Sequence, residues 1–224
     1  MMKEPEPRDV SGVMHRLSFE PWLEQQPHWP SRGRHILAQA DADTVVVYQA
    51  YKPSIAAAAV ADQRFGGGGF SFTRMSWLKT NFLWMMHRSS WATAVDQERV
   101  LALWVPRRLF VDWLRAAVAS SFDRRRYETE AAWRAALATS SVRLQWDPDH
   151  GPTGAPAERR AVQIGLRGDA LKAFGDGSLV AIDDVTDFVA EQREHRADRP
   201  RLITPHERVL DVDDDTAARI GLDV

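Results

Sequence analysis

The sequence of 224 residues contains no cysteine. This absence excludes disulfides, thiolate nucleophiles and sulfur-ligated metal sites, and it is compatible with a reducing compartment. The chain also lacks any run of about 18 apolar residues, so no segment is predicted to span a membrane. The first ten residues, MMKEPEPRDV, mix charges without an apolar core, which argues against a signal peptide. We therefore expect a cytoplasmic protein with no membrane partner.

A strong charge of either sign is also missing. The formal net charge of −2 and the pI near 6.4 argue against a chain-wide electrostatic grip on nucleic acid, although a local basic face stays compatible with them. Hydrophobic residues make up 44% and charged residues 27%, as is ordinary for a soluble globular protein. A chain of this length can bury a sizeable core.

Familiar catalytic signatures are absent. The chain holds no G-x-S-x-G and no H-E-x-x-H segment, and its seven histidines are scattered, so no metal site is predicted. The four glycines at 66–69 are not followed by Gly-Lys-Ser/Thr, which excludes a Walker-type phosphate loop and favours a flexible hinge. The acidic run at 211–215 has Thr216 and Leu222 where a calcium loop needs glycine and glutamate. We interpret that run as a solvated acidic end.

Strand and helix patterns mix along the chain without regular βαβ repetition. TVVVYQAY, at 44–51, is rich in β-branched and aromatic residues and predicts a buried strand, and an alanine-rich helix is expected after Pro53. The other predicted strands lie at 99–105, 142–148, 160–166, 179–182 and 208–212. The other predicted helices lie at 82–88, 109–118, 127–138, 169–174 and from 184 onwards. The pattern predicts an α+β fold with a mixed or antiparallel β-sheet core flanked by helices.

The predicted domain organisation is simple. Residues 1–20 are polar and contain proline, and we expect a mobile segment there. A single α+β domain is expected over 21–218, followed by a C-terminal tail at 219–224.

The segment TRMSWLKTNFLWMMHRSSWA, at 73–92, concentrates aromatic and basic residues. Its twenty positions hold three tryptophans seven residues apart and three cations: Trp77, Trp84, Trp91, Arg74, Lys79 and Arg88. Thr80 or Asn81 is a suitable cap for a helix that begins at Phe82, which leaves the residues before it extended. We therefore expect the helix to pack into the core, and Arg74, Trp77 and Lys79 to line a pocket.

Uncharged polar residues interrupt several predicted strands. Gln49 and Tyr51 share one face of their strand, and Tyr48 points to the other face, towards the core. Gln145 and Gln163 lie within apolar strands, where a buried amide needs a hydrogen-bonding partner. Two readings stay open for each of these amides: local pairing with neighbouring backbone, or a place in a polar site.

Several segments together resemble a known family. The blocks VYQAY, RMSWLKTNFLWMMHRSSWA, QERVLAL, VRLQWDPD and AVQIGLRG are similar to successive blocks of the DUF4291 family, a domain of unknown function. They run from about Arg34 to Arg208, which is nearly the whole chain. The family name implies no activity.

The opening strand and helix also resemble the layout of ADP-ribosyltransferase-like folds. That resemblance implies NAD, or another nucleotide, as cofactor. It assigns Gln49 to the nicotinamide ribose, Gln163 or Gln145 to the position of a later glutamate, and Tyr51 or Trp77 to stacking on nicotinamide. The candidate catalytic residues are then Gln49, Tyr51 and Gln163. A glutamine cannot act as a general base or stabilise a ribosyl cation by negative charge, so the sequence leaves the activity open.

Two functions from different classes therefore stand side by side. One is a nucleotide-using enzyme in which the cofactor-binding residues are Arg74, Trp77, Lys79, Arg88 and Gln145. The other is a non-catalytic module that stacks a nucleotide or single-stranded nucleic acid on the three tryptophans. We also consider a fold that places the strand at 44–51 beside the strand at 160–166. That arrangement would gather the following side chains around one concave site: Gln49, Tyr51, Gln163, Arg74 and Lys79.

Overall fold

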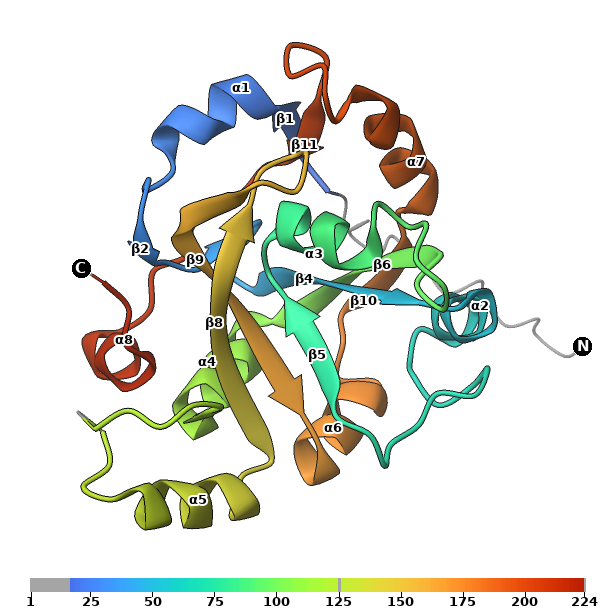
Figure 1. Cartoon of the computed structure of the whole chain (residues 1–224). Helices are drawn as coiled ribbons and strands as arrows, with labels where there is room; N and C mark the ends of the chain where they lie inside the picture. The colour runs from blue at the N-terminus through green and yellow to red at the C-terminus, as the bar shows by residue number, and fades with distance from the viewer. Residues whose placement is uncertain (1–16, 125, 224) are drawn as a thin grey trace, which may run out of the picture.

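The computed structural model describes residues 17–124 and 126–223. They form a single α+β domain in which helices cover both faces of a mixed, mostly antiparallel sheet (Figure 1). This confirms the predicted fold class. Most of the segment expected to be mobile, residues 1–16, lies outside the described residues, and its end enters strand β1 (Phe19–Pro21).

The central sheet has eight strands in the described part of the chain, and its continuous path runs β10-β6-β4-β5-β9-β8-β7. In that order the strands are β10 (Ala181–Asp184), β6 (Arg99–Pro106), β4 (Thr44–Tyr51), β5 (Ser76–Lys79), β9 (Pro156–Leu166), β8 (Val142–His150) and β7 (Val118–Ala119). Strand β2 (Gly33–Arg34) adds to β9 in parallel, and β7 adds to β8 in parallel. The other pairs along the path are antiparallel.

The strands at 44–51 and 160–166 are not direct neighbours, because β5 lies between β4 and β9. Tyr48 of β4 pairs with Lys79 of β5, and Lys79 pairs in turn with Gln163 of β9. The inserted strand has four residues, too few for its sequence pattern to show which strands it joins. Its backbone groups are satisfied only by a neighbour on each side.

Strand β4 is buried on both faces. Val45 and Val47 belong to one hydrophobic cluster, whereas Val46 and Tyr48 belong to another. This burial accounts for the nearly continuous apolar run in TVVVYQAY, because a strand covered on one side only would alternate apolar and polar residues. Tyr48 is fully buried on the face opposite Gln49, as predicted.

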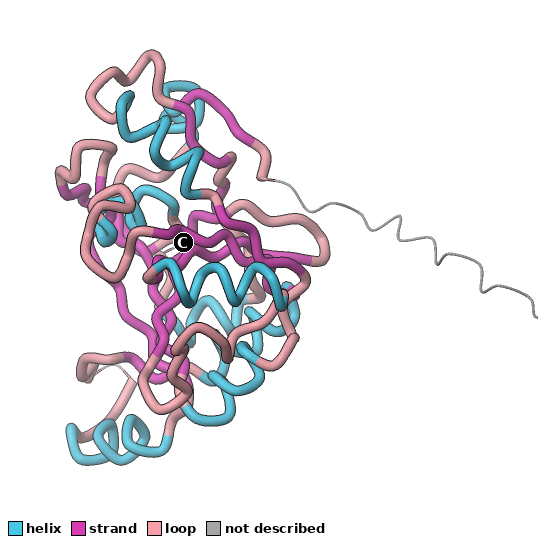
Figure 2. The backbone as a smooth tube through the Cα atoms, turned by 90° about the vertical axis from the view of Figure 1, so that its right-hand side faces the viewer, coloured by secondary structure: helices cyan, strands magenta, loops and turns pink. Residues whose placement is uncertain are grey.

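Helices supply the layers on the two faces (Figure 2). Buried residues of four helices join the first cluster: α2 (Pro53–Asp62), α4 (Arg107–Ala116), α6 (Gly168–Gly175) and α8 (Asp214–Ile220). Buried residues of three helices join the second cluster: α1 (Trp22–Gln25), α3 (Phe82–Ser89) and α7 (Thr186–His195). Helix α5 (Glu130–Thr139) contacts β7, and the 3₁₀ turn η1 (Gln26–His28) follows α1. None of the helices in the described ranges has the length and apolar character needed to cross a bilayer.

Helix α3 begins where the sequence predicts. The Asn81 side chain accepts a hydrogen bond from the Trp84 backbone N–H at 2.7 Å, so Asn81 is the N-cap. The core residues of the helix are the predicted ones: Phe82, Leu83, Met85 and Met86. Trp84 and Trp91 are also buried, with 8% and 7% of their surface exposed. A stacking surface made of all three tryptophans is therefore wrong.

Two small antiparallel sheets lie outside the central sheet. Strand β1 pairs with β11 (Ile203–Pro205), and β12 (Arg208–Val209) pairs with β3 (Leu37–Ala38) rather than extending the central sheet. The four aspartates of the acidic run at 211–215 are exposed, as predicted, and the run leads into helix α8. The Asp213 carboxylate caps that helix by accepting from the Thr216 backbone N–H at 3.0 Å. The domain boundary expected at residue 218 falls inside α8.

Candidate functional site

A cavity opens where strands β4 and β5 diverge. The two strands pair at one position, Tyr48 with Lys79. Beyond it, β4 continues beside β6 to Tyr51, while β5 runs back beside β9 to Ser76. The space between them has a volume of about 500 Å³. Its walls also include the start of α2, the loop after the four glycines, helix α3 and the loop that follows α3.

Polar side chains bridge the two strands where the backbone pairing ends. The Gln49 amide donates to the Ser76 hydroxyl at 2.7 Å and to the Trp77 carbonyl at 3.0 Å. The Tyr51 hydroxyl donates to the Gln49 carbonyl oxygen at 2.6 Å and lies 3.1 Å from the Ser76 hydroxyl. Burial raises the pKa of Tyr51 well above its ordinary value, although these hydrogen bonds act in the opposite direction. Gln49 and Tyr51 are thus held as a neutral network in the cavity wall.

Lys79 is the most unusual residue of the cavity. Only 5% of its surface is exposed, and its ammonium lies 4.6 Å from the centroid of the Trp84 ring. Within residues 17–124 and 126–223, no carboxylate lies within 4.0 Å of this ammonium. Desolvation by burial lowers the pKa of Lys79 to about 8, the positive charge of Arg88 adds to the decrease, and the negative charge of Asp147 opposes it.

A row of polar side chains extends from Lys79 across the neighbouring strands. Lys79 of β5 is paired with Gln163 of β9, which is paired with Gln145 of β8. Both amides donate to one carboxylate: Gln163 to Asp147 at 2.6 Å and Gln145 to the other Asp147 oxygen at 2.7 Å. The two glutamine amides therefore share one acceptor, the Asp147 carboxylate. They hold this carboxylate on the same face of the sheet as Lys79.

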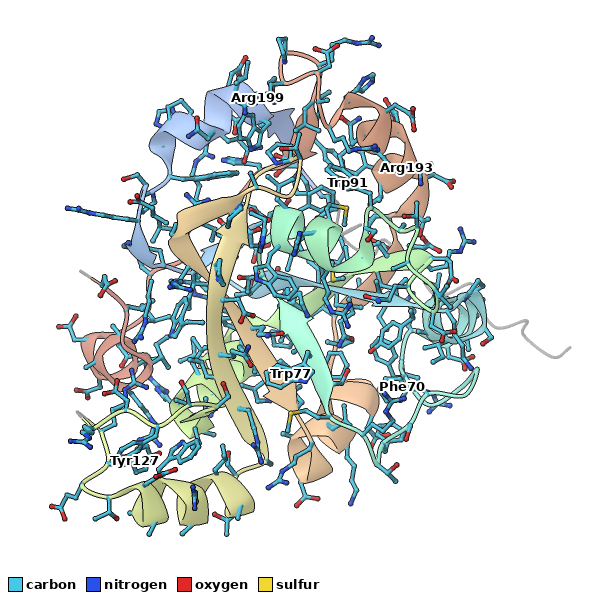
Figure 3. All side chains as sticks on the ribbon, in the orientation of Figure 1. Phe70, Trp77, Trp91, Tyr127, Arg193 and Arg199 are labelled. Carbon is cyan, nitrogen blue, oxygen red and sulfur yellow. The ribbon has the colours of Figure 1, made fainter. Side chains whose placement is uncertain are left out.

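The remaining predicted side chains lie nearer the mouth of the cavity. Arg74 and Arg88 are exposed and line it. Trp77 is half-buried and packs over Gly165, its partner across β5 and β9. A β-carbon at Gly165 would lie 3.0 Å from the Trp77 ring and 2.7 Å from the Met75 sulfur, so the glycine makes room for the indole. Figure 3 labels Trp77 on β5 and Phe70 on the loop after α2, two aromatic residues of the wall.

A strained turn follows α3 and leads to the residues that line the cavity. Three consecutive residues that are not glycine adopt left-handed backbone angles: Ser90, Trp91 and Ala92, with φ of 51°, 56° and 61°. Such angles cost on the order of 1–2 kcal/mol per residue. The Trp91 indole, which donates to the Pro152 carbonyl at 3.2 Å, anchors the turn. The chain then places Asp96, also left-handed, on the cavity rim.

The structure gathers most of the predicted site residues in this cavity. Seven of them line it: Gln49, Tyr51, Arg74, Trp77, Lys79, Arg88 and Gln163. Gln145 does not line it and reaches it through Asp147 and Gln163. Gln49 donates to the Trp77 backbone carbonyl, as the local-pairing reading expects, whereas Gln145 and Gln163 donate to the Asp147 carboxylate instead of to backbone. Their catalytic or cofactor-binding roles stay predictions.

Several residues of this region are missing from the sequence-based site. Ser76 joins Gln49 to β5, Asp147 sits between two glutamines, and Asp96 reaches the rim from a loop. Asp147 had a usable signal, because it follows Gln145 by two positions in VRLQWDPD and must share its face of the strand. Ser76 and Asp96 have no such signal.

A second polar cluster supports the start of α3 from behind. Glu207, with 1% of its surface exposed, accepts from the Phe82 backbone N–H at 2.6 Å and from the Asn81 amide at 3.3 Å. Burial raises the pKa of Glu207 well above its ordinary value, and the hydrogen bond from Phe82 opposes that increase. Nearby, Arg159 forms a buried ion pair with Asp149 and stacks 5.3 Å from the centroid of Trp29. The two Glu207 contacts hold the N-terminal end of α3.

No group of three or more His, Asp or Glu side chains in the described ranges is arranged to hold a metal ion. A nearly parallel pair of rings, His87 and His150, lies next to Trp84 with a centroid distance of 3.6 Å. Burial, and then the neighbouring His87, lower the pKa of His150. The two imidazole rings stack face to face beside Trp84, which is a packing contact and not the arrangement of two ligands around a metal ion.

Comparison with known proteins gives one family. A family model described as a domain of unknown function (DUF4291) matches residues 35–210. The matched range contains every residue that lines the cavity. A search of curated proteins gives no match.

Proposed function

This chain belongs to the DUF4291 family, and we propose that it binds a nucleotide in the cavity between β4 and β5. The phosphates would lie against Lys79, Arg74 and Arg88, and an aromatic ring of the ligand would stack on Trp77. The observation that carries the proposal is the imbalance of charge in the cavity wall. Its lining residues include four cations, Lys52, Arg74, Lys79 and Arg88, and a single carboxylate, Asp96.

This imbalance contrasts with the chain as a whole, whose formal net charge is −2. Like charges gathered around one space repel one another, so a bound anion would stabilise the arrangement. The volume of about 500 Å³ falls within the range of small-molecule sites. Aromatic walls and cations together suit a ligand that combines a planar ring with phosphate groups.

NAD is the most specific ligand to test, because strand β4 and helix α2 resemble the opening strand and helix of ADP-ribosyltransferase-like folds. In such a role the carboxylate that acts on the ribose would be Asp147 rather than Gln163. Gln163 lines the cavity and donates to the Asp147 carboxylate at 2.6 Å, so Asp147 is the carboxylate that is joined to the cavity through Gln163. NAD hydrolysis measured with wild type and Asp147→Asn tests it. Equal rates for the two proteins would remove Asp147 from the reaction.

Calorimetric titration with ATP, ADP and NAD tests nucleotide binding. Arg74→Ala and Lys79→Ala should each weaken binding about tenfold or more, because each removes a charge-assisted contact with phosphate. Arg134→Ala is the matched control, since Arg134 is an exposed arginine on α5 that pairs with Glu130. Thermal melts check that the variants fold. Unchanged affinity in both cavity variants would place the site elsewhere, and mass analysis of any copurifying small molecule gives an independent answer.

A single strand of nucleic acid is a weaker candidate for the ligand. Trp84 and Trp91 are buried, which leaves the half-buried Trp77 as the most accessible stacking surface of the three. Affinity for a single-stranded oligonucleotide well above that for ATP, with a steep dependence on salt, would reverse this preference.

A further inference from the structure

Lys79 differs from the other cations of the cavity in its surroundings. Arg74 and Arg88 are exposed and can bind phosphate at little cost, whereas the Lys79 amine is buried beside the Trp84 ring. An arginine at this position would stay charged, because a guanidinium does not lose its proton in proteins. A lysine can become neutral, and a neutral amine is a nucleophile. The burial of a lysine here is therefore compatible with chemistry as well as with binding.

The position of the Lys79 backbone is also fixed. Its backbone is paired on both sides, with Tyr48 on β4 and with Gln163 on β9. Its ammonium has no carboxylate within ion-pair distance in the described ranges, so no such partner has to be displaced before the amine can react. The Asp147 carboxylate, held by hydrogen bonds from two glutamine amides, is close enough to influence its charge.

We propose that the Lys79 amine is a nucleophile that forms an imine with an aldehyde that also carries a phosphate group. This chemical class includes the open-chain form of a phosphorylated sugar and a nucleotide with a free reducing sugar. The inference rests on the proposed function for its phosphate contacts, which Arg74 and Arg88 would make. The covalent step belongs to Lys79.

The step is balanced without an oxidant or reductant. The lone pair of the neutral Nζ attacks the carbonyl carbon and forms the C–N bond, and the carbonyl oxygen gains a proton. Loss of that oxygen as water then gives the C=N bond, and addition of water reverses the reaction. Asp147 is the nearby group suited to accept the proton that the nitrogen releases. With its pKa at about 8, the neutral fraction of Lys79 at pH 7 exceeds that of an ordinary lysine by roughly two orders of magnitude.

Reductive trapping tests the proposal, because the chain has four lysines: Lys3, Lys52, Lys79 and Lys172. The full chain is incubated with pyridoxal 5′-phosphate or, as a smaller probe, glyceraldehyde 3-phosphate. Borohydride then fixes any imine, and peptide mapping locates it. We expect Lys79 to be labelled at least tenfold faster than Lys172, which is exposed on α6, even though Lys79 is buried. We also expect inorganic pyrophosphate to slow the labelling of Lys79, and pyridoxal without phosphate to react more slowly.

Faster labelling of Lys172 than of Lys79 with both probes would overturn the proposal. Labelling of Lys79 at equal rates by pyridoxal and its phosphate would overturn the phosphate requirement. Titration of the wild-type protein with ATP, ADP and NAD, run beside the labelling experiment, separates this inference from the proposed function. Nucleotide binding by a wild-type protein that shows no preferential labelling of Lys79 would leave the proposed function standing and refute the reactive amine.

Discussion

The ammonium of Lys79, on strand β5, lies 4.6 Å from the centroid of the ring of Trp84, on helix α3. The aromatic face offsets part of the cost of burying the charge, as cation–π contacts do in desolvated sites. It does not supply the full stabilisation that a carboxylate would. Lys79 is therefore a residue that the fold tolerates at a cost in stability, which is typical of functional positions.

Replacing this lysine by an apolar residue of similar length should stabilise the protein. The pKa of Lys79 falls from 10.5 to about 8 on folding, which corresponds to a destabilisation of roughly 3 kcal/mol that the substitution removes. The substitution also removes the contact with Trp84, which costs about 1 kcal/mol. We expect Lys79→Met to raise the free energy of unfolding by about 2 kcal/mol at pH 7, measured by urea denaturation. Lys172→Met, at an exposed position, is the control and should change it little.

The same substitution has a defined pH dependence. Between pH 8 and 10.5 the unfolded chain keeps the proton on Lys79 and the folded protein does not, so wild-type stability rises with pH in this window. Lys79→Met lacks this rise. The difference between its free energy of unfolding and that of wild type should therefore shrink as the pH is raised from 7 to 9.5. An advantage that grows with pH would contradict the assigned shift.

Arg88 should control the titration of Lys79. Its positive charge is the second cause of the lowered pKa, after desolvation. We expect Arg88→Gln to move the pKa of Lys79 upwards from about 8 without restoring the ordinary value, because burial remains. The measurement is the pH dependence of reductive methylation at Lys79 with formaldehyde, a reagent without phosphate. Arg134→Gln on α5 controls for net charge, and a downward shift in Arg88→Gln would be inconsistent with repulsion between the two cations.

Two tyrosines of β4 should respond differently to loss of the hydroxyl. The Tyr51 hydroxyl donates to Gln49, whereas the Tyr48 hydroxyl is buried and finds no hydrogen-bonding partner among the described residues. We expect Tyr51→Phe to destabilise the protein by about 1–2 kcal/mol, because Gln49 loses its donor. Tyr48→Phe should be neutral or stabilising. Equal effects in thermal melts of the two variants would argue against the network that joins β4 to β5.

Glu207 should make stability depend on pH in the acidic to neutral range. Burial raises its folded-state pKa well above the ordinary 4.5, so the folded protein holds a proton that the unfolded chain releases. Stability attributable to this group therefore falls as the pH rises from about 4.5 through the folded-state pKa. Glu207→Gln keeps an oxygen for the Phe82 N–H and removes the titration.

Urea denaturation between pH 4.5 and 8 measures this effect. The stability of Glu207→Gln relative to wild type should increase with pH across the window. Glu158→Gln removes an exposed carboxylate and controls for the change in net charge. A relative stability that does not change with pH would show that Glu207 titrates in the folded protein as it does in the unfolded chain.

The sequence by itself determined the elements whose causes are local. The β-branched run at 44–51 gives β4, and Asn81 begins α3 because a side chain three residues upstream can cap the Trp84 N–H. The alternation along β4 also separates Tyr48 from Gln49 and Tyr51. Capping, alternation and residue preference act within a few positions, so they can be read without knowledge of the fold.

Only the tertiary structure decided how these elements meet. The insertion of β5 between β4 and β9, and the divergence that opens the cavity, depend on backbone pairing between residues far apart in the chain. Glu207 reaches the start of α3 across 125 positions, and Gln49 reaches Ser76 across 27. The burial that lowers the pKa of Lys79 comes from packing against Trp84 and from nearby Arg88. These effects depend on distance in space, which a sequence pattern does not encode.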